Sequence, residues 1–223
     1  MNDNILSNLF HIDENIIKKS EEIDNNLYET FKKIDSIKVH NQYKIIHAMQ
    51  ESRISDQHFN WTTGYGYNDI GREKLEEVYA KIFKTEDAIV RPTIANGTHA
   101  LTLCLTGLLH TGDEMIAVTG KPYDTLHELI GISGSYRGSF KNIGISYKQS
   151  DFLENGDIDF ESIKNFVSEK TTLVYIQRST GYGFRKALSI FTIKKIIELV
   201  KKINPAIICM IDNCYGEFLD THE

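Results

Sequence analysis

Residues at three places along the chain have the types and spacing to bind an anionic ligand that carries a flat ring. Residues 96–100 read NGTHA before an expected helix, whose first backbone N–H groups, at Gly97 and Thr98, could receive an anion. Tyr123 could lay its aromatic ring against a flat ligand. Asp212 directly follows an apolar run, and its carboxylate could pair with a cationic ring nitrogen.

Each of these segments also has an ordinary structural explanation. Residues 96–100 could form a plain glycine turn with a threonine near the start of a helix. Pro122 could end a strand, with Asp124 or Thr125 capping the next helix, and Asp212 could cap the turn that follows it. The occurrence of all three segments in one chain favours the ligand site over these separate explanations.

Other residues that could carry chemistry give weaker signals. Arg178 follows a further expected strand and could bind a carboxylate or phosphate through two N–H groups, or form a surface ion pair. The eight histidines are dispersed, and no spacing suggests a metal site. No nucleophile elbow, Walker A loop or dinucleotide-binding glycine fingerprint follows a suitable strand, so simple hydrolase, P-loop and Rossmann interpretations lack support.

The elements that must position these residues alternate between strands and helices. Short β-rich runs occupy residues 88–90, 115–118, 143–147, 173–176 and 207–211. Helical patterns occupy residues 98–109, 125–130, 160–167 and 190–203. This alternation predicts an α/β fold with a mostly parallel sheet and helices on both faces. Ligands bind such sheets beyond the carboxyl ends of the strands, where the three segments would meet.

A different pattern precedes the alternation. Residues 12–53 carry apolar side chains at helical spacing and predict one or two amphipathic helices, which could cover this chain's own domain or a partner subunit. Residues 55–71 have a loop composition with aromatic side chains, and residues 72–83 again look helical. We expect an N-terminal helical arm and loop over residues 1–71 and a second domain over residues 72–223.

Composition restricts the function classes. The chain has 223 residues, with 25 Lys and Arg against 31 Asp and Glu, so it lacks the overall basic excess of a protein that binds nucleic-acid phosphates. Its start does not resemble a signal peptide, and no apolar run is long enough for a membrane span. Three cysteines without a CxxC pair fit a reducing compartment. We expect a cytoplasmic protein with no nucleic-acid or membrane partner.

The longer strings around these residues resemble one family. They occupy residues 64–76 (GYGYNDIGREKLE), 96–101, 120–126 and 211–218. They are similar to the bacterial methionine γ-lyase-like proteins, which are also called aluminium resistance proteins or candidate cystathionine β-lyases. These proteins belong to the fold type I, aspartate aminotransferase-like group of pyridoxal 5′-phosphate enzymes. The resemblance covers nearly the whole chain.

The resemblance implies a role for each cofactor-binding residue. Backbone N–H groups of Gly97 and Thr98 would bind the cofactor phosphate, with His99 lining the turn. Tyr123 would stack on the pyridine ring, and Asp212 would keep the ring nitrogen protonated.

Two further groups of residues take roles from the same resemblance. Tyr65 or Tyr67, with Arg72, would reach the phosphate of a neighbouring subunit, which implies a homo-oligomer. Where related lyases carry an asparagine after a strand, this chain offers Arg178 and Ser179, which are the expected contacts of the substrate carboxylate.

The resemblance also implies that the large domain is incomplete. The family's Schiff-base lysine follows the strand that carries Asp212, and neither Lys121 nor Lys186 has the spacing to replace it. We therefore expect the N-terminal portion of a carbon–sulfur lyase for a sulfur amino acid of the cystathionine or methionine type, inactive by itself. Alternatives are a non-catalytic cofactor-binding or assembly module and a fragment of another fold type I enzyme, such as an aminotransferase.

Overall fold

The computed structural model describes residues 3–62, 65, 67 and 69–222, and the chain divides into two compact units. The helical unit comprises Met1–Ala88 and Phe218–Thr221, and the sheet unit comprises Ile89–Glu217 and His222–Glu223. The expected domain boundary after Gly71 stays a prediction.

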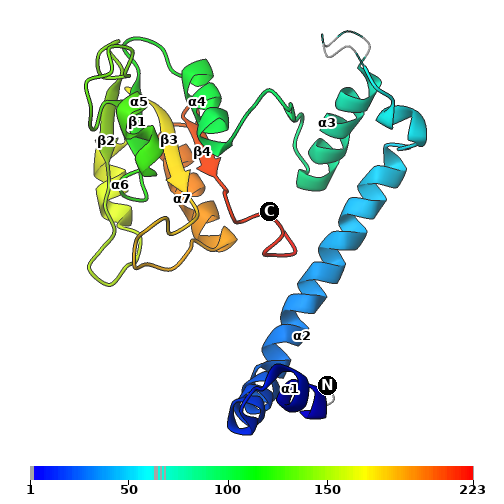
Figure 1. Cartoon of the computed structure of the whole chain (residues 1–223). Helices are drawn as coiled ribbons and strands as arrows, with labels where there is room; N and C mark the ends of the chain where they lie inside the picture. The colour runs from blue at the N-terminus through cyan, green and yellow to red at the C-terminus, as the bar shows by residue number, and fades with distance from the viewer. Residues whose placement is uncertain (1–2, 63–64, 66, 68, 223) are drawn as a thin grey trace. The chain divides into compact units, whose positions relative to one another are not determined.

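The sheet unit is built on four parallel strands (Figure 1). These are β1 (Glu114–Ala117), β2 (Ser146–Gln149), β3 (Thr171–Gln177) and β4 (Ile208–Asp212), in the order β2-β1-β3-β4. In the register of the last pair, Gln177 lies beside Asp212, so β3 and β4 end together. The predicted parallel α/β sheet is confirmed.

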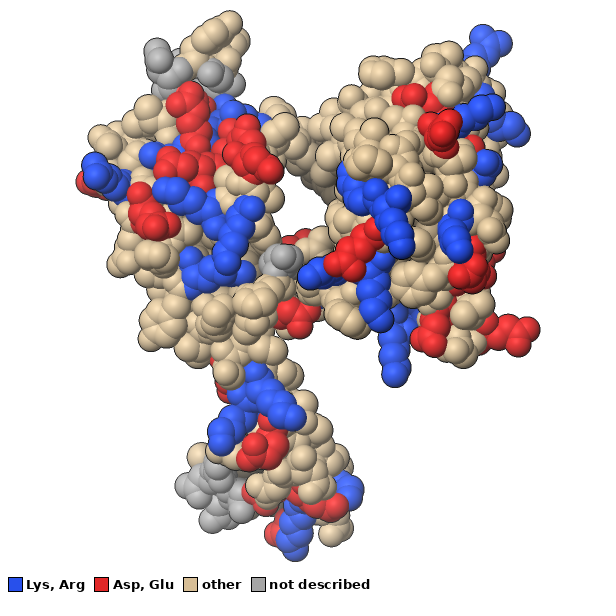
Figure 2. All heavy atoms as spheres, turned by 180° about the vertical axis from the view of Figure 1, so that it is seen from behind, with Lys and Arg blue, Asp and Glu red and all other residues tan. Residues whose placement is uncertain are grey.

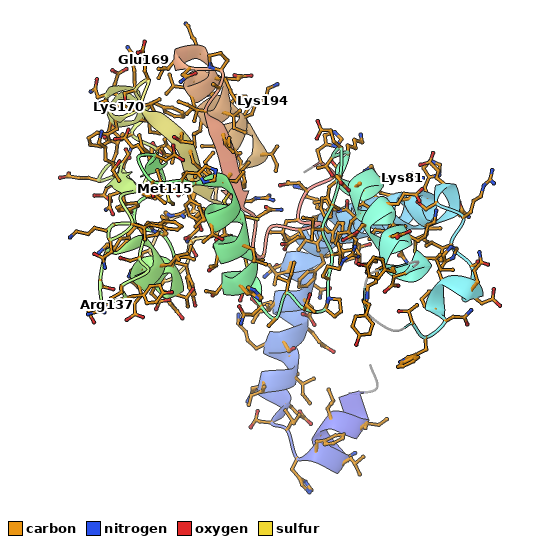
Figure 3. All side chains as sticks on the ribbon, turned by 90° about the horizontal axis from the view of Figure 1, so that it is seen from above. Lys81, Met115, Arg137, Glu169, Lys170 and Lys194 are labelled. Atoms are coloured by element: carbon orange, nitrogen blue, oxygen red, sulfur yellow. The ribbon has the colours of Figure 1, made fainter. Side chains whose placement is uncertain are left out.

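Helices cover both faces of this sheet, as predicted. One face packs against α4 (Gly97–Leu108) and α5 (His127–Ile130), and the other packs against α6 (Phe160–Phe166) and α7 (Ile190–Ile203). Strand side chains on the first face are Met115, Ala117, Leu173 and Tyr175, and those on the second face are Ile116, Val174 and Ile176. Successive strand residues point to opposite faces, which produces two cores from one sheet. Met115, labelled in Figure 3, is fully buried in one of them.

Two predicted strands differ from the observed ones. Residues 88–90 do not form a strand, and the Ile89 side chain is 77% exposed. Their β-rich composition is insufficient because a strand also needs a neighbouring strand for its backbone hydrogen bonds. The strand predicted at residues 143–147 begins later, at Ser146, because Gly144 has a positive φ of 84° and belongs to the preceding turn.

The helix predicted at residues 125–130 is divided. A 3₁₀ turn, η2 (Asp124–Leu126), leads into the single α-helical turn α5. That turn ends at Gly131, where φ is +90° and a Cβ atom would lie 2.6 Å from Cβ of Lys141. Only glycine fits this position without strain.

The helical unit contains α1 (Asp3–Phe10), α2 (Glu14–Glu51), η1 (Asp56–Phe59) and α3 (Ile70–Phe83). The helical pattern of residues 12–53 is therefore confirmed as one long helix. Asp13 caps α2 by accepting a hydrogen bond from the Asn15 N–H.

The segment at residues 218–221 packs onto α2 and α3 within this unit. The rings of Phe218 and Phe83 stack with centroids 5.6 Å apart. Asn41 Nδ2 donates hydrogen bonds to the carbonyl oxygens of Phe218 and Asp220. These contacts attach the segment to the small core around Val78 and Ile82.

Surface chemistry is mixed in both units. On the face shown in Figure 2, Lys and Arg side chains lie among Asp and Glu side chains. Helix α2 leaves six large apolar side chains at least 46% exposed: Ile16, Ile23, Tyr28, Phe31, Ile34 and Tyr43. None of the helices among the described residues combines the length and apolar character needed to cross a membrane.

Helix α4 provides a matched test of the packing against the sheet. Leu105 is fully buried, whereas Leu103 on the same helix is 46% exposed. We expect Leu105→Ala to lower the free energy of unfolding by about 2–5 kcal/mol through cavity formation, and Leu103→Ala to lower it by less than about 1 kcal/mol. Urea unfolding followed by circular dichroism measures both. Equal losses would contradict this packing.

Candidate ligand site at the carboxyl edge of the sheet

Most of the residues predicted to bind a ligand gather at one edge of the sheet unit. Tyr123 follows β1, Arg178 follows β3, and Asp212 ends β4. The start of α4 reaches the same edge, because Thr98 Oγ1 lies 2.8 Å from Thr125 Oγ1. The topology therefore assembles residues that are more than a hundred positions apart in sequence.

The start of α4 has the features of an anion site. The Asn96 side chain caps the helix by accepting a 2.8 Å hydrogen bond from the His99 N–H. His99 Nδ1 accepts from the Ala95 N–H at 3.2 Å, so this ring fixes the turn. The N–H groups of Gly97 and Thr98 open the helix and have no acceptor within it. A Cβ atom at Gly97 would meet nothing within 4 Å, so the approach to these amides is open.

Asp212 is a buried carboxylate bound by neutral donors. Its residue is 6% exposed. Oδ2 accepts a 2.8 Å hydrogen bond from the Tyr175 hydroxyl, and Oδ1 accepts from the Cys214 N–H at 3.1 Å. No cationic side chain pairs with Asp212 among the residues that the structure describes. A buried carboxylate is costly without a positive partner, and each oxygen retains capacity for a further donor.

The neighbouring tyrosine responds to this carboxylate. Tyr175 is fully buried. Burial, and then the negative charge of Asp212 and the hydrogen bond to it, raise the pKa of the Tyr175 hydroxyl. Tyr175 therefore remains a hydrogen-bond donor to Asp212 throughout the neutral range.

Arg178 holds the loop that follows Asp212. Its backbone N–H donates to the Asp212 carbonyl oxygen at 3.0 Å. Its Nη1 donates at 2.9 Å to both Asn213 Oδ1 and the Gly216 carbonyl oxygen, and its Nε donates to the Leu188 carbonyl oxygen. Arg178 is only 4% exposed, so these bonds indicate a positioning role. A direct contact of Arg178 and Ser179 with substrate stays a prediction.

Tyr123 has a partner that sequence reasoning missed. Its ring stacks on Tyr182 with centroids 5.6 Å apart, and the two hydroxyl oxygens lie 3.0 Å apart. This hydrogen bond and the neighbouring phenol raise the pKa of Tyr123 to about 12. The stack with Tyr182 occupies one face of the Tyr123 ring. The signal for Tyr182 was its place between Gly181 and Gly183.

The remaining predicted residues belong to the helical unit. Tyr65 and Tyr67 are more than 80% exposed, and Arg72 forms a 2.9 Å ion pair with Asp69. Their contact with a neighbouring subunit's phosphate stays a prediction. Within the described part of the chain, no three His, Cys, Asp or Glu side chains are grouped to hold a metal ion.

Comparison with known proteins identifies strong similarities. A family model described as methionine gamma-lyase matches residues 16–223. Protein YnbB of Bacillus subtilis is 43% identical over 193 residues, which cover 86% of this chain and 46% of YnbB. This chain therefore spans about half the length of that curated relative.

Solved structures extend the likeness to the fold. A candidate cystathionine beta-lyase involved in aluminum resistance from Clostridium acetobutylicum has a TM-score of 0.92 and 43% identity, over 98% of this chain and 53% of that one. A carbon-sulfur lyase involved in aluminum resistance from Clostridium novyi has a TM-score of 0.91 and 48% identity, over 97% and 52%. The pyridoxal-5′-phosphate-dependent protein YhfS of Escherichia coli, with a TM-score of 0.56 and 17% identity over 78% and 43%, shares the fold alone.

The hydrogen bond between Tyr175 and Asp212 predicts a pH-dependent stability. Tyr175→Phe leaves Asp212 with one donor fewer, so we expect a loss of about 1.5–3 kcal/mol at neutral pH. The pKa of Tyr175 is higher in the folded chain than in the unfolded chain, where it is near 10. The protonated hydroxyl therefore contributes its full stabilisation below about pH 10, and this contribution falls as the pH rises further. The difference between wild type and variant should therefore narrow above about pH 10.

Urea unfolding at several pH values measures this difference, with the exposed Tyr43→Phe as a control. A difference that stays constant through the alkaline range would contradict the linkage.

The Arg178 contacts predict an intolerance at Gly216. A Cβ atom there would clash with Asn213 Oδ1 and lie 2.7 Å from Arg178 Nη1 and 2.8 Å from Arg178 Cδ, so it would disturb both partners of the Arg178–Asn213 hydrogen bond. We expect Gly216→Ala to destabilise the sheet unit by about 1–3 kcal/mol and to speed amide exchange at residues 213–216. Gly107→Ala, in open space on α4, should stabilise the chain by up to about 1 kcal/mol. Unchanged exchange in Gly216→Ala would refute the positioning role of Arg178.

Proposed function

Because the chain belongs to the methionine gamma-lyase family, we propose that it binds pyridoxal 5′-phosphate at the carboxyl edge of its sheet. The family comprises lyases related to cystathionine beta-lyase and methionine gamma-lyase. We propose that the chain is the N-terminal portion of such a carbon–sulfur lyase, acting on a cystathionine-type or methionine-type sulfur amino acid. The observation that carries this proposal is the buried Asp212 without a cationic partner among the described residues.

The residues present fit the cofactor. The open amides of Gly97 and Thr98 suit its phosphate, and the aromatic ring of Tyr123 at the same edge of the sheet suits its ring. Asp212 would accept a charge-assisted hydrogen bond from a protonated ring nitrogen, which supplies the positive partner that its burial requires. His99 holds the turn through Ala95 and lines the phosphate end.

Asp212 has the central role among this chain's residues. When bound, pyridoxal phosphate supplies an electron sink for negative charge that develops at the substrate α-carbon. Asp212 would keep the proton on the ring nitrogen, which makes that sink effective. Tyr175 and the Cys214 amide fix the carboxylate oxygens, and Arg178 fixes the loop behind them. These residues bind and orient; proton transfer at the substrate requires a separate base.

We assign that base, the Schiff-base lysine, to the part of the relatives' length that this sequence does not span. The chain covers 46% of YnbB and about half of each of the two Clostridium structures. On this proposal the 223-residue chain binds the cofactor without turning over substrate.

We further propose that the whole protein is a cytoplasmic homo-oligomer. Exposed apolar side chains on α2 offer a surface that a neighbouring subunit would cover. Tyr65, Tyr67 and Arg72 would then contact the neighbouring subunit's phosphate, as the resemblance implies. Arg72 would exchange or share its present ion pair with Asp69.

Cofactor binding tests the role of Asp212 directly. Titration of the chain with pyridoxal phosphate, followed by cofactor absorbance and fluorescence, should show saturable binding that Asp212→Asn weakens by about tenfold or more. Asp151→Asn is the matched control, because Asp151 is an exposed aspartate just beyond the end of β2, which lies at the opposite edge of the sheet from β4. Equal affinity in the wild type and Asp212→Asn would reject the assigned site.

The reaction class is tested in a protein that includes the remaining half. With L-cystathionine it should release thiol, ammonia and a keto acid, and Asp212→Asn should slow this reaction by about a hundredfold or more. Consumption of cystathionine, cysteine and methionine without thiol release would reject the lyase, and transfer of the amino group to a keto acid would indicate an aminotransferase.

A further inference from the structure

A pocket lies beside Tyr123, within the sheet unit. It has a volume of about 1070 Å³, is open to solvent, and is lined by residues of the loops that follow β1, β2 and β3. Tyr123 lines this pocket, but Gly97, Thr98 and Asp212 do not. It is therefore a distinct space that shares one aromatic wall with the cofactor site.

Gln177 lines this pocket and carries an unsatisfied acceptor. Gln177 is only 6% exposed. The backbone N–H donates to Thr119 Oγ1 at 2.9 Å, and Nε2 donates to the Ser179 carbonyl oxygen at 3.3 Å. Oε1 is buried and has no hydrogen-bond partner within the described part of the chain. An unsatisfied buried acceptor is unfavourable, so a donor from a ligand would be stabilising here.

Arg185 presents an unneutralised cation on the same wall. Its Nη2 donates to the carbonyl oxygens of Gln177 and Ser179, at 3.2 and 2.5 Å, and Nη1 donates to the Lys186 carbonyl oxygen at 3.1 Å. Its guanidinium lies 4.5 Å from the Phe152 ring centroid. No carboxylate pairs with it among the described residues, and two of its five N–H donors remain unused.

A buried acceptor next to a fixed cation matches one chemical group. The α-ammonium of an amino acid donates hydrogen bonds, and its α-carboxylate accepts them from a guanidinium. Acidic and basic side chains both line the pocket, namely Asp124, Glu154, Asp157, Lys121 and Lys186, which suits a zwitterion better than an anion.

We propose that this pocket binds an α-amino-acid group, with its carboxylate on Arg185 and its ammonium on Gln177 Oε1. One source of this group is the distal end of a thioether substrate bound at the neighbouring cofactor site. This source rests on the proposed function. The group could equally belong to a separate small amino acid. Both sources present the same chemistry to these two residues.

Three matched probes test the binding on the 223-residue chain without cofactor. They are L-homoserine, 3-amino-1-propanol, which lacks the carboxylate, and 4-hydroxybutyrate, which lacks the ammonium. Isothermal titration should show homoserine binding at least about tenfold more tightly than either analogue. Failure of homoserine to bind at about 50 mM, or equal affinity of all three probes, would overturn the proposal.

Variants assign the two contacts. Arg185→Gln should reduce homoserine affinity to that of 3-amino-1-propanol, and Gln177→Leu should reduce it to that of 4-hydroxybutyrate. Lys194→Gln, which removes an exposed cation on α7 outside the pocket, should leave homoserine affinity unchanged. Arg185→Lys keeps the charge and should retain part of the affinity if Arg185→Gln fails to fold. Wild-type affinity in both Arg185 variants would refute the assignment.

The two sources are separated with chain to which pyridoxal phosphate has been added. If the distal end of a substrate occupies the pocket, Arg185→Gln should weaken L-cystathionine binding more than S-methyl-L-cysteine binding. If a separate amino acid occupies it, Arg185→Gln should leave the binding of L-cystathionine and of S-methyl-L-cysteine to the cofactor-loaded chain equally unaffected. Cofactor binding is measured in a separate titration. A chain that does not bind the cofactor can therefore be distinguished from a chain whose pocket does not bind homoserine.

Discussion

The carboxyl edge of the sheet depends on the hydrogen bonds that the buried Asp212 carboxylate accepts. Asp212 ends β4, where burial would be unfavourable without donors directed at both oxygens. One donor is Tyr175, whose ring belongs to the core between the sheet and α4 and α5. The other is the Cys214 amide in the following turn. Core packing and the proposed ligand site therefore share one side chain, so a change in either affects the other.

Parallel register makes this arrangement possible. Gln177 and Asp212 are neighbours at the ends of β3 and β4, so residues just beyond them face the same space. Arg178 uses that proximity to bind the loop after Asp212, and Arg185 returns to the carbonyl oxygens of Gln177 and Ser179. Arg178 and Arg185 both lie in the loop between β3 and α7, but they have different effects. Arg178 fixes the carboxylate's surroundings, whereas Arg185 places a positive charge in the adjacent pocket.

Tyr123 connects the two spaces. It follows β1, stacks on Tyr182 and lines the pocket, while its neighbour Thr125 contacts Thr98 at the start of α4. A ring at this position can separate a cofactor from the group beyond it, and the hydroxyl contact with Tyr182 restrains its orientation. The family relationship supplies the chemistry proposed for one side, and the charges of this chain suggest the chemistry of the other.

The amino-acid pattern predicted the α/β class, the parallel sheet, the bounds of the helix at residues 190–203 and the place of Asp212 at a strand end. These features follow from the period of apolar residues, which is a local property of the chain. Tertiary structure decided that residues 88–90 are not a strand, that Arg178 is buried in a clamp, and that Tyr182 meets Tyr123. Each depends on which segments become neighbours, and Arg178 and Gly216 are 38 positions apart. The local period of apolar residues does not predict such pairings, because they result from strand order and register.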